Sequence, residues 1–284
     1  MELPLLSINC LTYNHGSYIV EALDGFLMQN TNFEYEVILC DDCSTDSTKS
    51  LVEEYIKNHT KGYRIKYFRH EKNLGMIENV LFSFNQCTAK YVALCEGDDF
   101  WTDPCKLQRQ VDFLEANEEY AICFTAYKIR NELNNQQTIN DSIFGSFTIE
   151  DIIKGNSFST ASVVFVSKYF NPQIEWFLKM PFGDWTLYLV ILFQSEKKAY
   201  CLKDITSVYR IHLGGIHGNL HSSNLKLVTA YKMHIQFYRS IKKYLFKDDY
   251  GLLIKQEIKN RKDIIYKLLR SEGKNVSALL SKWY

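Results

Sequence analysis

The chain has 284 residues, a length that suits one large domain or two small ones. Apolar residues make up 46% and charged residues 23%, which is globular usage and argues against a disordered or low-complexity chain. Lysine plus arginine and aspartate plus glutamate both number 33, so the net charge is zero, which argues against a nucleic-acid binder that relies on bulk charge.

The neutral total hides an uneven distribution of charge. Residues 216–284 contain 14 Lys/Arg and 5 Asp/Glu, a net charge of +9, and the remaining residues contain 19 and 28, a net charge of −9. Charge runs of this kind usually form a solvated helix face. The alternative is a basic amphipathic surface that is attracted to an anionic membrane.

The sequence predicts a cytoplasmic protein without a transmembrane segment. The longest apolar run, residues 185–193, is far shorter than the ~18–20 residues that a spanning helix needs. The first residues lack the basic region of a signal peptide. The eight cysteines are scattered, and the one close pair, Cys40 and Cys43, lacks the partner pair of a zinc site or the helix start of a redox motif. Reduced thiols in the cytoplasm are the simpler interpretation, with peripheral contact at the inner face of the plasma membrane as an extension of it.

The first hundred residues alternate between strand and helix patterns. Strands are expected at residues 5–10, 35–40, 64–69 and 91–95, with amphipathic helices between them. This order predicts a mostly parallel sheet with helices on both faces. Polar clusters at 12–15, 41–46 and 96–99 follow strand ends, where ligands bind to sheets of this kind, and therefore predict a site.

The second half is less regular. A helix at 106–116 and strands near 120–129, 162–166 and 208–212 are expected, with a buried helix at 185–193. The polar, asparagine-rich stretch 130–146 reads as a flexible loop or lid. Beyond residue 222 the pattern is helical, with apolar stripes over 228–245 and 254–269.

Phosphate-binding glycine loops are missing from the expected places. The chain has no Walker A motif and no G-x-G-x-x-G after its first strand, which argues against P-loop NTPases and dinucleotide enzymes. The acidic run Glu96-Gly97-Asp98-Asp99 offers the oxygen ligands that suit Mg²⁺ or Mn²⁺ carrying a diphosphate. The alternative is a solvated acidic turn or a helix N-terminus.

Several separated motifs, in the right order, resemble those of family 2 glycosyltransferases with the GT-A fold. The motifs lie at Ser7 to Asn14, Val37 to Asp46, Asn73 to Gly75, Glu96 to Leu107, Gly183 to Trp185 and Tyr209 to Gly215. The resemblance covers Leu5 to about Gly215. Two positions depart from the family pattern: Cys43 stands where glycine is usual, and Glu96 stands where the first aspartate of the DXD motif is usual.

The resemblance implies an α/β fold of the GT-A type, a Rossmann-like, mostly parallel sheet flanked by helices. We expect a glycosyltransferase domain at 1–221, with a nucleotide-binding half at 1–104 and an acceptor half at 105–221, and a basic helical C-terminal extension at 222–284. The implied activity is metal-dependent, inverting transfer of a hexosyl or N-acetylhexosaminyl group from a nucleoside diphosphate sugar to a glycan or lipid-linked acceptor hydroxyl. Polysaccharide synthesis for the cell envelope is the context that the resemblance suggests.

On the nucleotide side, the resemblance gives Tyr13 the role of stacking on the base and Asp42 that of accepting a hydrogen bond from the ring N–H. Leu11, Asn14 and Asn73 complete this side. Together they imply a uridine nucleotide, with thymidine and guanosine left open.

At the metal, Asp98 would ligate Mn²⁺ or Mg²⁺ bridging the two phosphates, and Glu96 would hold the ribose or share the metal. Asp99 is either a second ligand or a helix cap. His212 is either a ligand or a surface histidine. Arg210 would reach the diphosphate as its loop closes.

On the acceptor side, Asp184 could take the proton from the attacking hydroxyl, and Trp185 could stack on a sugar face. A single base without a second nucleophile predicts one displacement with inversion. The alternative for Asp184 is a helix N-cap, and the two roles are compatible.

Two rival functions remain open from the sequence. A sugar-phosphate nucleotidyltransferase would need a basic N-terminal phosphate loop, and residues 11–16 hold no Lys or Arg. A sugar-nucleotide or glycan-binding module without turnover is opposed by the presence of both Asp184 and Arg210. Turnover measurements separate these two classes from a transferase.

Overall fold

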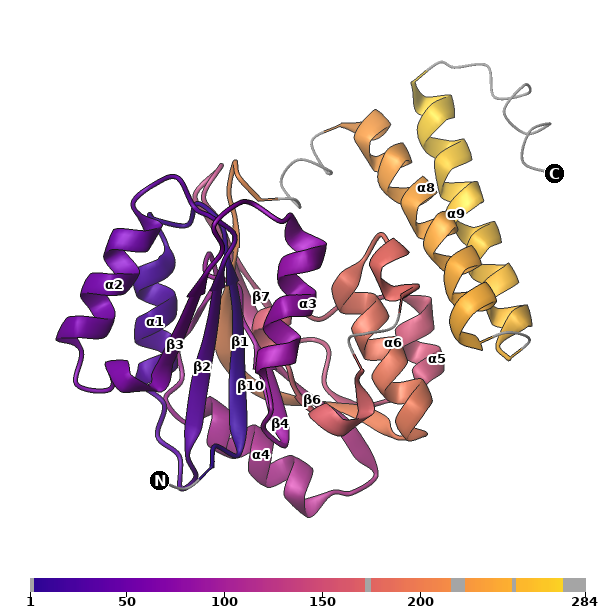
Figure 1. Cartoon of the computed structure of the whole chain (residues 1–284). Helices are drawn as coiled ribbons and strands as arrows, with labels where there is room; N and C mark the ends of the chain where they lie inside the picture. Colours follow the sequence, from indigo (N-terminus) through magenta and orange to yellow (C-terminus); the bar gives the residue numbers. More distant parts are fainter. Residues whose placement is uncertain (1–2, 172–174, 216–222, 247–248, 273–284) are drawn as a thin grey trace.

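The computed structural model describes residues 3–171, 175–215, 223–246 and 249–272. Its N-terminal half alternates strictly between strand and helix, in the order β1 (Leu6–Thr12), α1 (Ile19–Leu27), β2 (Tyr35–Asp41), α2 (Thr48–Asn58), β3 (Ile65–Arg69), α3 (Met76–Gln86) and β4 (Tyr91–Leu94). These strands pair in parallel in the order β3-β2-β1-β4. Helices α1 and α2 lie on one side of them and α3 on the other (Figure 1). The predicted parallel sheet is confirmed here.

The sheet continues in the second half and becomes mixed. This half contains β5 (Phe100–Trp101), α4 (Lys106–Ala116), β6 (Tyr120–Asn131), β7 (Gln136–Asn140), β8 (Gly145–Phe147), α5 (Ile149–Lys154), β9 (Val164–Val166), α6 (Gly183–Ser195) and β10 (Lys198–Ile211). Strand β9 is antiparallel to both β4 and β6, whereas β6 and β10 run parallel. The described strands form one sheet, and the α/β fold class is confirmed with antiparallel pairs entering at β9.

The prediction of a flexible lid at 130–146 is wrong. Strand β7 pairs antiparallel with the end of β6, from Tyr127↔Asn140 to Asn131↔Gln136. Strand β8 pairs antiparallel with β10. The asparagines suit the turn between β6 and β7, where Asn135 adopts a left-handed φ of 56°. Polar composition indicated a loop, but cross-strand pairing outweighs it, since a solvated hairpin needs few apolar side chains.

The C-terminal extension forms a helical pair, α8 (Asn224–Ile241) and α9 (Gly251–Ser271), with a π-helical segment, Lys242–Phe246, continuing α8 (Figure 1). Its apolar stripes pack inward. Phe237, Tyr238, Ile241, Leu245, Phe246 and Ile254 belong to the same core as α5 and α6. The helical pair is therefore packed on the body of the protein. Among the described residues, no helix is both long enough and apolar enough to cross a membrane.

All eight cysteines lie in the described part of the chain and are unpaired. Cys40 is buried in β2, and Cys43 follows that strand with a φ of 63°. This left-handed conformation costs glycine nothing and strains a residue with a Cβ, which accounts for the glycine that is usual at this position of the family pattern.

Candidate active site

Polar side chains gather where β1, β2 and β4 end, and we call this region the carboxyl edge of the sheet. The ends of β1 and β2 are adjacent, since Asp42 N donates to Thr12 O at 3.0 Å. Asn14, with a φ of 57°, accepts from Thr45 N at 2.8 Å through its side chain. This turn leaves Tyr13 on the surface with 44% of its area exposed. The aromatic face predicted for the nucleobase is thus accessible.

Asp42 and Asn73 lie together, next to Tyr13. The Asp42 carboxylate accepts from the backbone N–H groups of Leu74 at 2.6 Å and Gly75 at 2.9 Å. Asn73 Nδ2 donates to Asp42 O at 3.0 Å. Gly75 has a φ of 84°, which allows the turn to present both N–H groups. Asp42 therefore holds the 73–75 turn in place, and each of its oxygens keeps one further lone pair for a ligand.

The acidic run after β4, residues 96–99, packs closely against β1. Gly97 N donates to Leu11 O at 2.9 Å, which places the Leu11 backbone beneath the acidic turn. A Cβ at Gly97 would come within 2.9 Å of Thr12 Oγ1 and Ile19 Cδ1, so a larger residue would require these side chains to shift. Gly97 thus allows a close approach of the acidic turn to β1 and α1.

Asp98 lies between two imidazoles. His212 Nε2 is 3.0 Å and His15 Nε2 is 3.6 Å from Asp98 Oδ2. Burial acts to raise the pKa of Asp98, but the hydrogen bond with His212 and the charge of His15 outweigh it and lower that pKa. His212 is buried and packs against the ring of Tyr18, so it is not a surface histidine. Sequence reasoning missed His15, although it directly follows the Tyr-Asn turn.

These groups fit a divalent cation. Carboxylate and imidazole are ligands that Mn²⁺ accepts, and Thr12 Oγ1 and His15 Nδ1 are buried polar atoms that lack a hydrogen-bond partner in the described structure. Among the described residues, no group of three His, Cys, Asp or Glu side chains could hold an ion by itself. The described residues would thus supply only part of a coordination shell, which is usual where substrate phosphates and water complete it.

Asp99 does not cap a helix but holds the backbone of β10. Its buried carboxylate accepts from Arg210 N at 2.8 Å, and β5, rather than a helix, begins at the next residue. Burial and the charges of Asp98 and Glu96 raise the pKa of Asp99. Asp99 therefore fastens β10 to the acidic turn. The helix-cap expectation is wrong because no helix starts there.

The guanidinium of Arg210 already has partners within the protein. This group is fully buried, donates to Asp98 O and pairs with Glu21, and it lies over the rings of Phe100 at 4.4 Å and Tyr18 at 5.0 Å. The expectation that it reaches a diphosphate does not match this position. Arg210 instead fixes the backbone of Asp98, and so positions the carboxylate of that residue.

Glu96 is held by a residue from the second half of the chain. Thr160 Oγ1 donates to Glu96 Oε2 at 2.5 Å. Burial, followed by the charges of Asp98 and Asp184, raises the pKa of Glu96 to about 7, against the hydrogen bond from Thr160. Glu96 therefore lies near both of these carboxylates. Thr160 is 64 residues away in the chain and carries no motif, so sequence reasoning could not find it.

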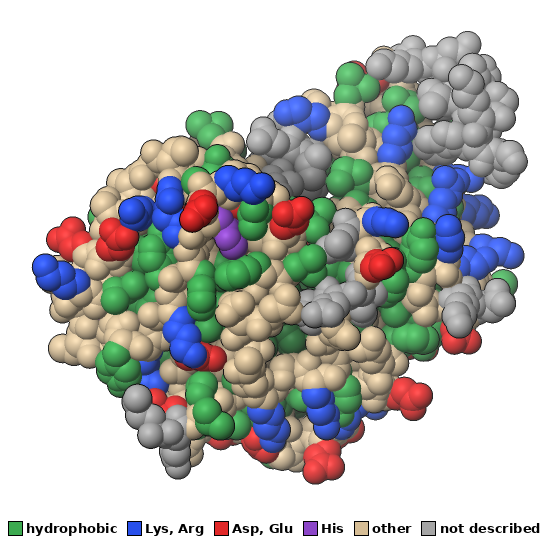
Figure 2. All heavy atoms as spheres, viewed as in Figure 1, with side chains coloured by type: hydrophobic (Ala, Val, Ile, Leu, Met, Phe, Trp, Pro, Cys, Tyr) green, Lys and Arg blue, Asp and Glu red, His purple; other side chains and the backbone are tan. Residues whose placement is uncertain are grey.

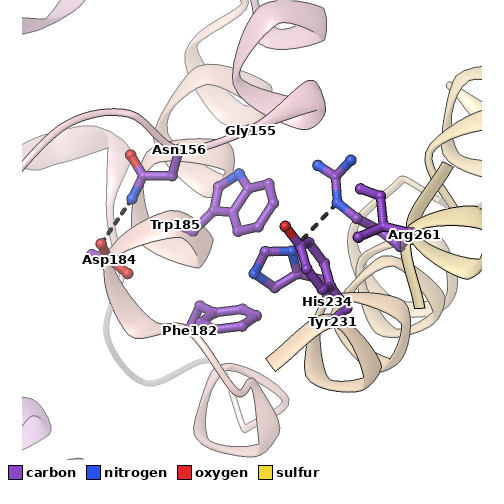
Figure 3. A pocket seen from close by; sticks show the side chains of 9 residues that line it. Gly155, Asn156, Phe182, Asp184, Trp185, Tyr231, His234 and Arg261 are labelled. Atoms are coloured by element: carbon purple, nitrogen blue, oxygen red, sulfur yellow. Dashed lines mark hydrogen bonds between the residues drawn. The ribbon is translucent and has the colours of Figure 1, made fainter. Parts of the chain in front are cut away.

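Asp184 lies in the first turn of α6 and is partly buried. Asn156 Nδ2 donates to Asp184 Oδ2 at 2.8 Å, and Phe158 N donates to Asn156 Oδ1, which fixes the orientation of the amide (Figure 3). Burial raises the pKa of Asp184, against the hydrogen bonds that its carboxylate accepts. A carboxylate with a raised pKa at the N-terminus of a helix is suited to accept a proton near neutral pH.

Two tyrosines, Tyr188 and Tyr209, feel the charge of these carboxylates. Burial and the charges of Asp184 and Glu96 raise the pKa of Tyr188, and its buried hydroxyl has no hydrogen-bond partner among the described residues. Burial and the charges of Asp99, Glu96, Asp98 and Asp184 raise the pKa of Tyr209. An unpaired buried hydroxyl is costly, and a bound substrate could supply its partner.

Trp185 points away from open solvent. It is buried, its Nε1 donates to Ile152 O at 2.7 Å, and its ring packs against Phe237 at 4.5 Å. The indole nevertheless contributes to the lining of a pocket beside Asp184. Trp185 therefore builds the acceptor side as part of its wall.

Replacing Asn156 with alanine should move the pH profile of the reaction proposed below. Without its hydrogen bond, the pKa of Asp184 rises further, so the acid limb of kcat/KM should shift to higher pH by about one unit, the effect of one hydrogen bond to a charged group. The rate near pH 9 should change little. Asn140→Ala, which removes hydrogen bonds to Tyr127 and Ser157 instead, serves as the control, and equal shifts in both variants would contradict the role of Asn156.

The sequence is similar to those of known proteins. The profile of the family described as "Glycosyl transferase family 2" matches residues 7–170, more than half of the chain. An uncharacterized protein of Mycobacterium tuberculosis is 33% identical over 227 residues, and the match covers 78% of this chain and 63% of that relative. The chain thus spans less than two thirds of the length of that relative.

Two solved structures share the fold. S. aureus TarS 1–349 in complex with UDP-GlcNAc superposes with a TM-score of 0.59 at 18% identity, covering 93% of this chain and 71% of that chain. A mannosyltransferase from Pyrobaculum calidifontis in complex with GDP-Man and Mn²⁺ has a TM-score of 0.59 at 17% identity, covering 99% of this chain and 80% of that chain. At such identities the likeness shows the fold alone. Together, the family profile, the order of the strands and these neighbours show that the chain belongs to glycosyl transferase family 2 and has the GT-A fold.

Proposed function

We propose that the protein transfers a sugar from a nucleoside diphosphate sugar to an acceptor hydroxyl. The observation that carries this proposal is the position of Asp98, whose carboxylate lies between His212 and His15 at the carboxyl edge of the sheet. The chain thus places a carboxylate and two imidazoles, which suit a divalent cation, at the same sheet edge as the exposed ring of Tyr13. Family membership argues for the same chemistry and against the nucleotidyltransferase alternative.

The nucleotide would lie along the ends of β1 and β2. Tyr13 offers an exposed ring for stacking, and Asp42, held against the 73–75 turn, has lone pairs for a base N–H. TarS is described in complex with UDP-GlcNAc, which favours a uridine donor here, and the GDP-Man complex of the Pyrobaculum enzyme keeps guanosine as the alternative. A divalent cation held by Asp98 and His212 would offset negative charge on the departing diphosphate.

The transfer would be a single displacement. Asp184 takes the proton of the acceptor hydroxyl, and the acceptor oxygen forms a bond to the anomeric carbon on the face opposite the diphosphate. The bond from the anomeric carbon to the diphosphate oxygen breaks, and the nucleoside diphosphate leaves with that electron pair. The anomeric configuration is inverted. Arg210 and Asp99 act as positioning residues that hold Asp98 and β10.

Release of nucleoside diphosphate tests this function. The full chain is incubated with UDP-, dTDP- and GDP-sugars, with and without Mn²⁺, and free diphosphate is measured. We expect slow release from one class of donor that depends on Mn²⁺ and increases when a saccharide acceptor is added. Binding of a donor without any release under these conditions would instead identify a binding module without turnover.

We propose further that the helical pair touches an anionic membrane, as the charge of +9 over residues 216–284 suggests. Figure 2 shows lysine and arginine side chains over α8 and α9, whose apolar stripes are used in packing. The attraction would then be electrostatic. With the cytoplasmic location expected from the sequence, the surface would be the inner face of the plasma membrane, and a lipid-linked saccharide would be the acceptor.

Charge reversal of exposed lysines on the helical pair should abolish this contact. We expect the wild-type chain to sediment with vesicles containing anionic lipid at low salt, and to be released by about 0.5 M salt as screening shortens the Debye length. Lys243, Lys255 and Lys259 changed together to glutamate should lose sedimentation. The matched control carries the same reversal on the body, at Lys49, Lys57 and Lys72. Equal sedimentation of the two variants would leave the basic helices as an ordinary solvated face.

A further inference from the structure

A pocket of about 480 Å³ lies beside Asp184, a size typical of small-ligand sites (Figure 3). One wall comes from the turn after α5 and the first turn of α6, with Asn156, Phe182, Asp184 and Trp185. The facing wall comes from the helical pair, with Tyr231 and His234 on α8 and Arg261 and Ile264 on α9. Seven of the nine lining residues therefore lie beyond residues 7–170, the part of the chain that the family profile matches.

The helical pair is held firmly against the other wall. Arg261 Nη2 donates to Lys154 O at 2.8 Å, at the end of α5, and Arg261 Nε donates to His234 Nδ1 at 3.4 Å. Tyr238 OH donates to Ile153 O at 3.0 Å. Glu257 pairs with Arg261 at 3.1 Å and balances its charge. The pocket is thus preformed, and Arg261 connects both helices to the body and is not an unpaired anion receptor.

The lining combines aromatic rings with polar groups. His234 makes edge contacts with Phe182 at 5.0 Å, Trp185 at 5.5 Å and Tyr231 at 5.6 Å between ring centroids. The carboxylate of Asp184 and the amide of Asn156 lie at the same pocket. A saccharide matches this arrangement, because its C–H faces pack on aromatic rings while its hydroxyls need hydrogen-bond partners.

We propose that this pocket is the acceptor subsite and holds the terminal sugar of a saccharide acceptor, with a hydroxyl toward Asp184. The helical pair supplies the wall that selects this sugar, through Tyr231 and His234. This inference rests on the proposed function, since it takes Asp184 as the base. The nucleotide would bind along the ends of β1 and β2, which contribute no residue to this pocket, so UDP alone should leave the subsite free.

Saturation-transfer NMR on the full chain tests the subsite. The probes are methyl α- and β-glycosides of glucose, galactose, mannose, N-acetylglucosamine and N-acetylgalactosamine. We expect at least one glycoside to bind, and its signal to persist with saturating UDP and Mn²⁺. Tyr231→Ala should weaken that binding about fivefold, the effect of losing one aromatic contact. Ile264→Trp should also block it, by filling the pocket from α9 without removing a contact.

Tyr244→Ala is the matched control, because Tyr244 is an exposed tyrosine of the same helical pair that lies outside this pocket and stacks on Trp176. It should leave glycoside binding unchanged. Each variant is also tested for stabilisation by UDP, which reports the nucleotide side and correct folding. Glycoside signals that are absent, equal in all variants or displaced by UDP overturn the subsite while nucleotide binding stands. Loss of UDP binding in the wild type would instead overturn the proposed function.

Discussion

Asp98→Asn should nearly abolish sugar transfer and remove the part of UDP stabilisation that depends on Mn²⁺. The substitution deletes an anionic ligand without changing the shape of the side chain. It also removes the carboxylate that lies between His212 at 3.0 Å and His15 at 3.6 Å, so a cation would meet two imidazoles without a balancing negative charge. The measurement is the rise in melting temperature with UDP, in the presence and absence of Mn²⁺, together with turnover.

Asp112→Asn provides the control for this prediction. Asp112 is an exposed acid of α4 whose side chain accepts a hydrogen bond from Gln108. Its variant should keep both the Mn²⁺ effect and full turnover. If Asp98→Asn behaved like Asp112→Asn, Asp98 would not be a metal ligand, and the imidazoles around it would need another explanation.

Asp184→Asn should keep UDP affinity within a few-fold and lower turnover by about 10²- to 10⁴-fold, the usual contribution of a general base. The asparagine can still accept the hydrogen bond from Asn156, and it avoids burying a charge, so the fold should tolerate it. The measurement compares UDP binding with the rate of transfer. Collapse of nucleotide binding in this variant would show that Asp184 is structural.

The pH dependence of the wild type gives a second test of Asp184. A base acts when it is deprotonated, and burial raises the pKa of this carboxyl above the usual range for aspartate. Activity should therefore increase with pH through that raised pKa and decline as pH falls below it. The acid limb should disappear or move in Asp184→Asn. A profile that is flat from pH 4 to pH 7 in the wild type would contradict a base with a raised pKa.

The alternation of elements predicted the N-terminal half well, because β1, β2 and β4 are short buried strands and amphipathic helices separate β1 to β4. Local patterns determine both features. In the second half, the positions of several strands depend on contacts between residues that are distant in the sequence. The asparagine-rich stretch is polar on its own, yet it forms β7 by pairing with β6. The short antiparallel strand β9 is defined by its pairing with β4 and β6.

In the candidate site, too, local motifs located some residues, and contacts between distant segments determined the others. Tyr13, Asp42, Asn73 and Asp98 each follow the end of a strand in the parallel sheet, so local patterns were enough to place them at one edge, and their roles stay predictions. The motifs could not show that Asp99 and Arg210 bind each other across 111 residues. Thr160, Asn156 and Tyr188 come from segments without a signature, and only the packing of α5, α6 and β9 brings them to the carboxylates.

The central claim is a metal-assisted nucleotide site at the carboxyl edge, and a thermal-shift panel of nucleoside diphosphates and sugar nucleotides tests it most directly. The wild-type chain is measured with UDP, dTDP and GDP and with their sugars, each with and without Mn²⁺. We expect one nucleotide class, uridine first, to raise the melting temperature, with a larger rise when Mn²⁺ is present. A melting temperature that no nucleotide changes, with or without Mn²⁺, would contradict the claim.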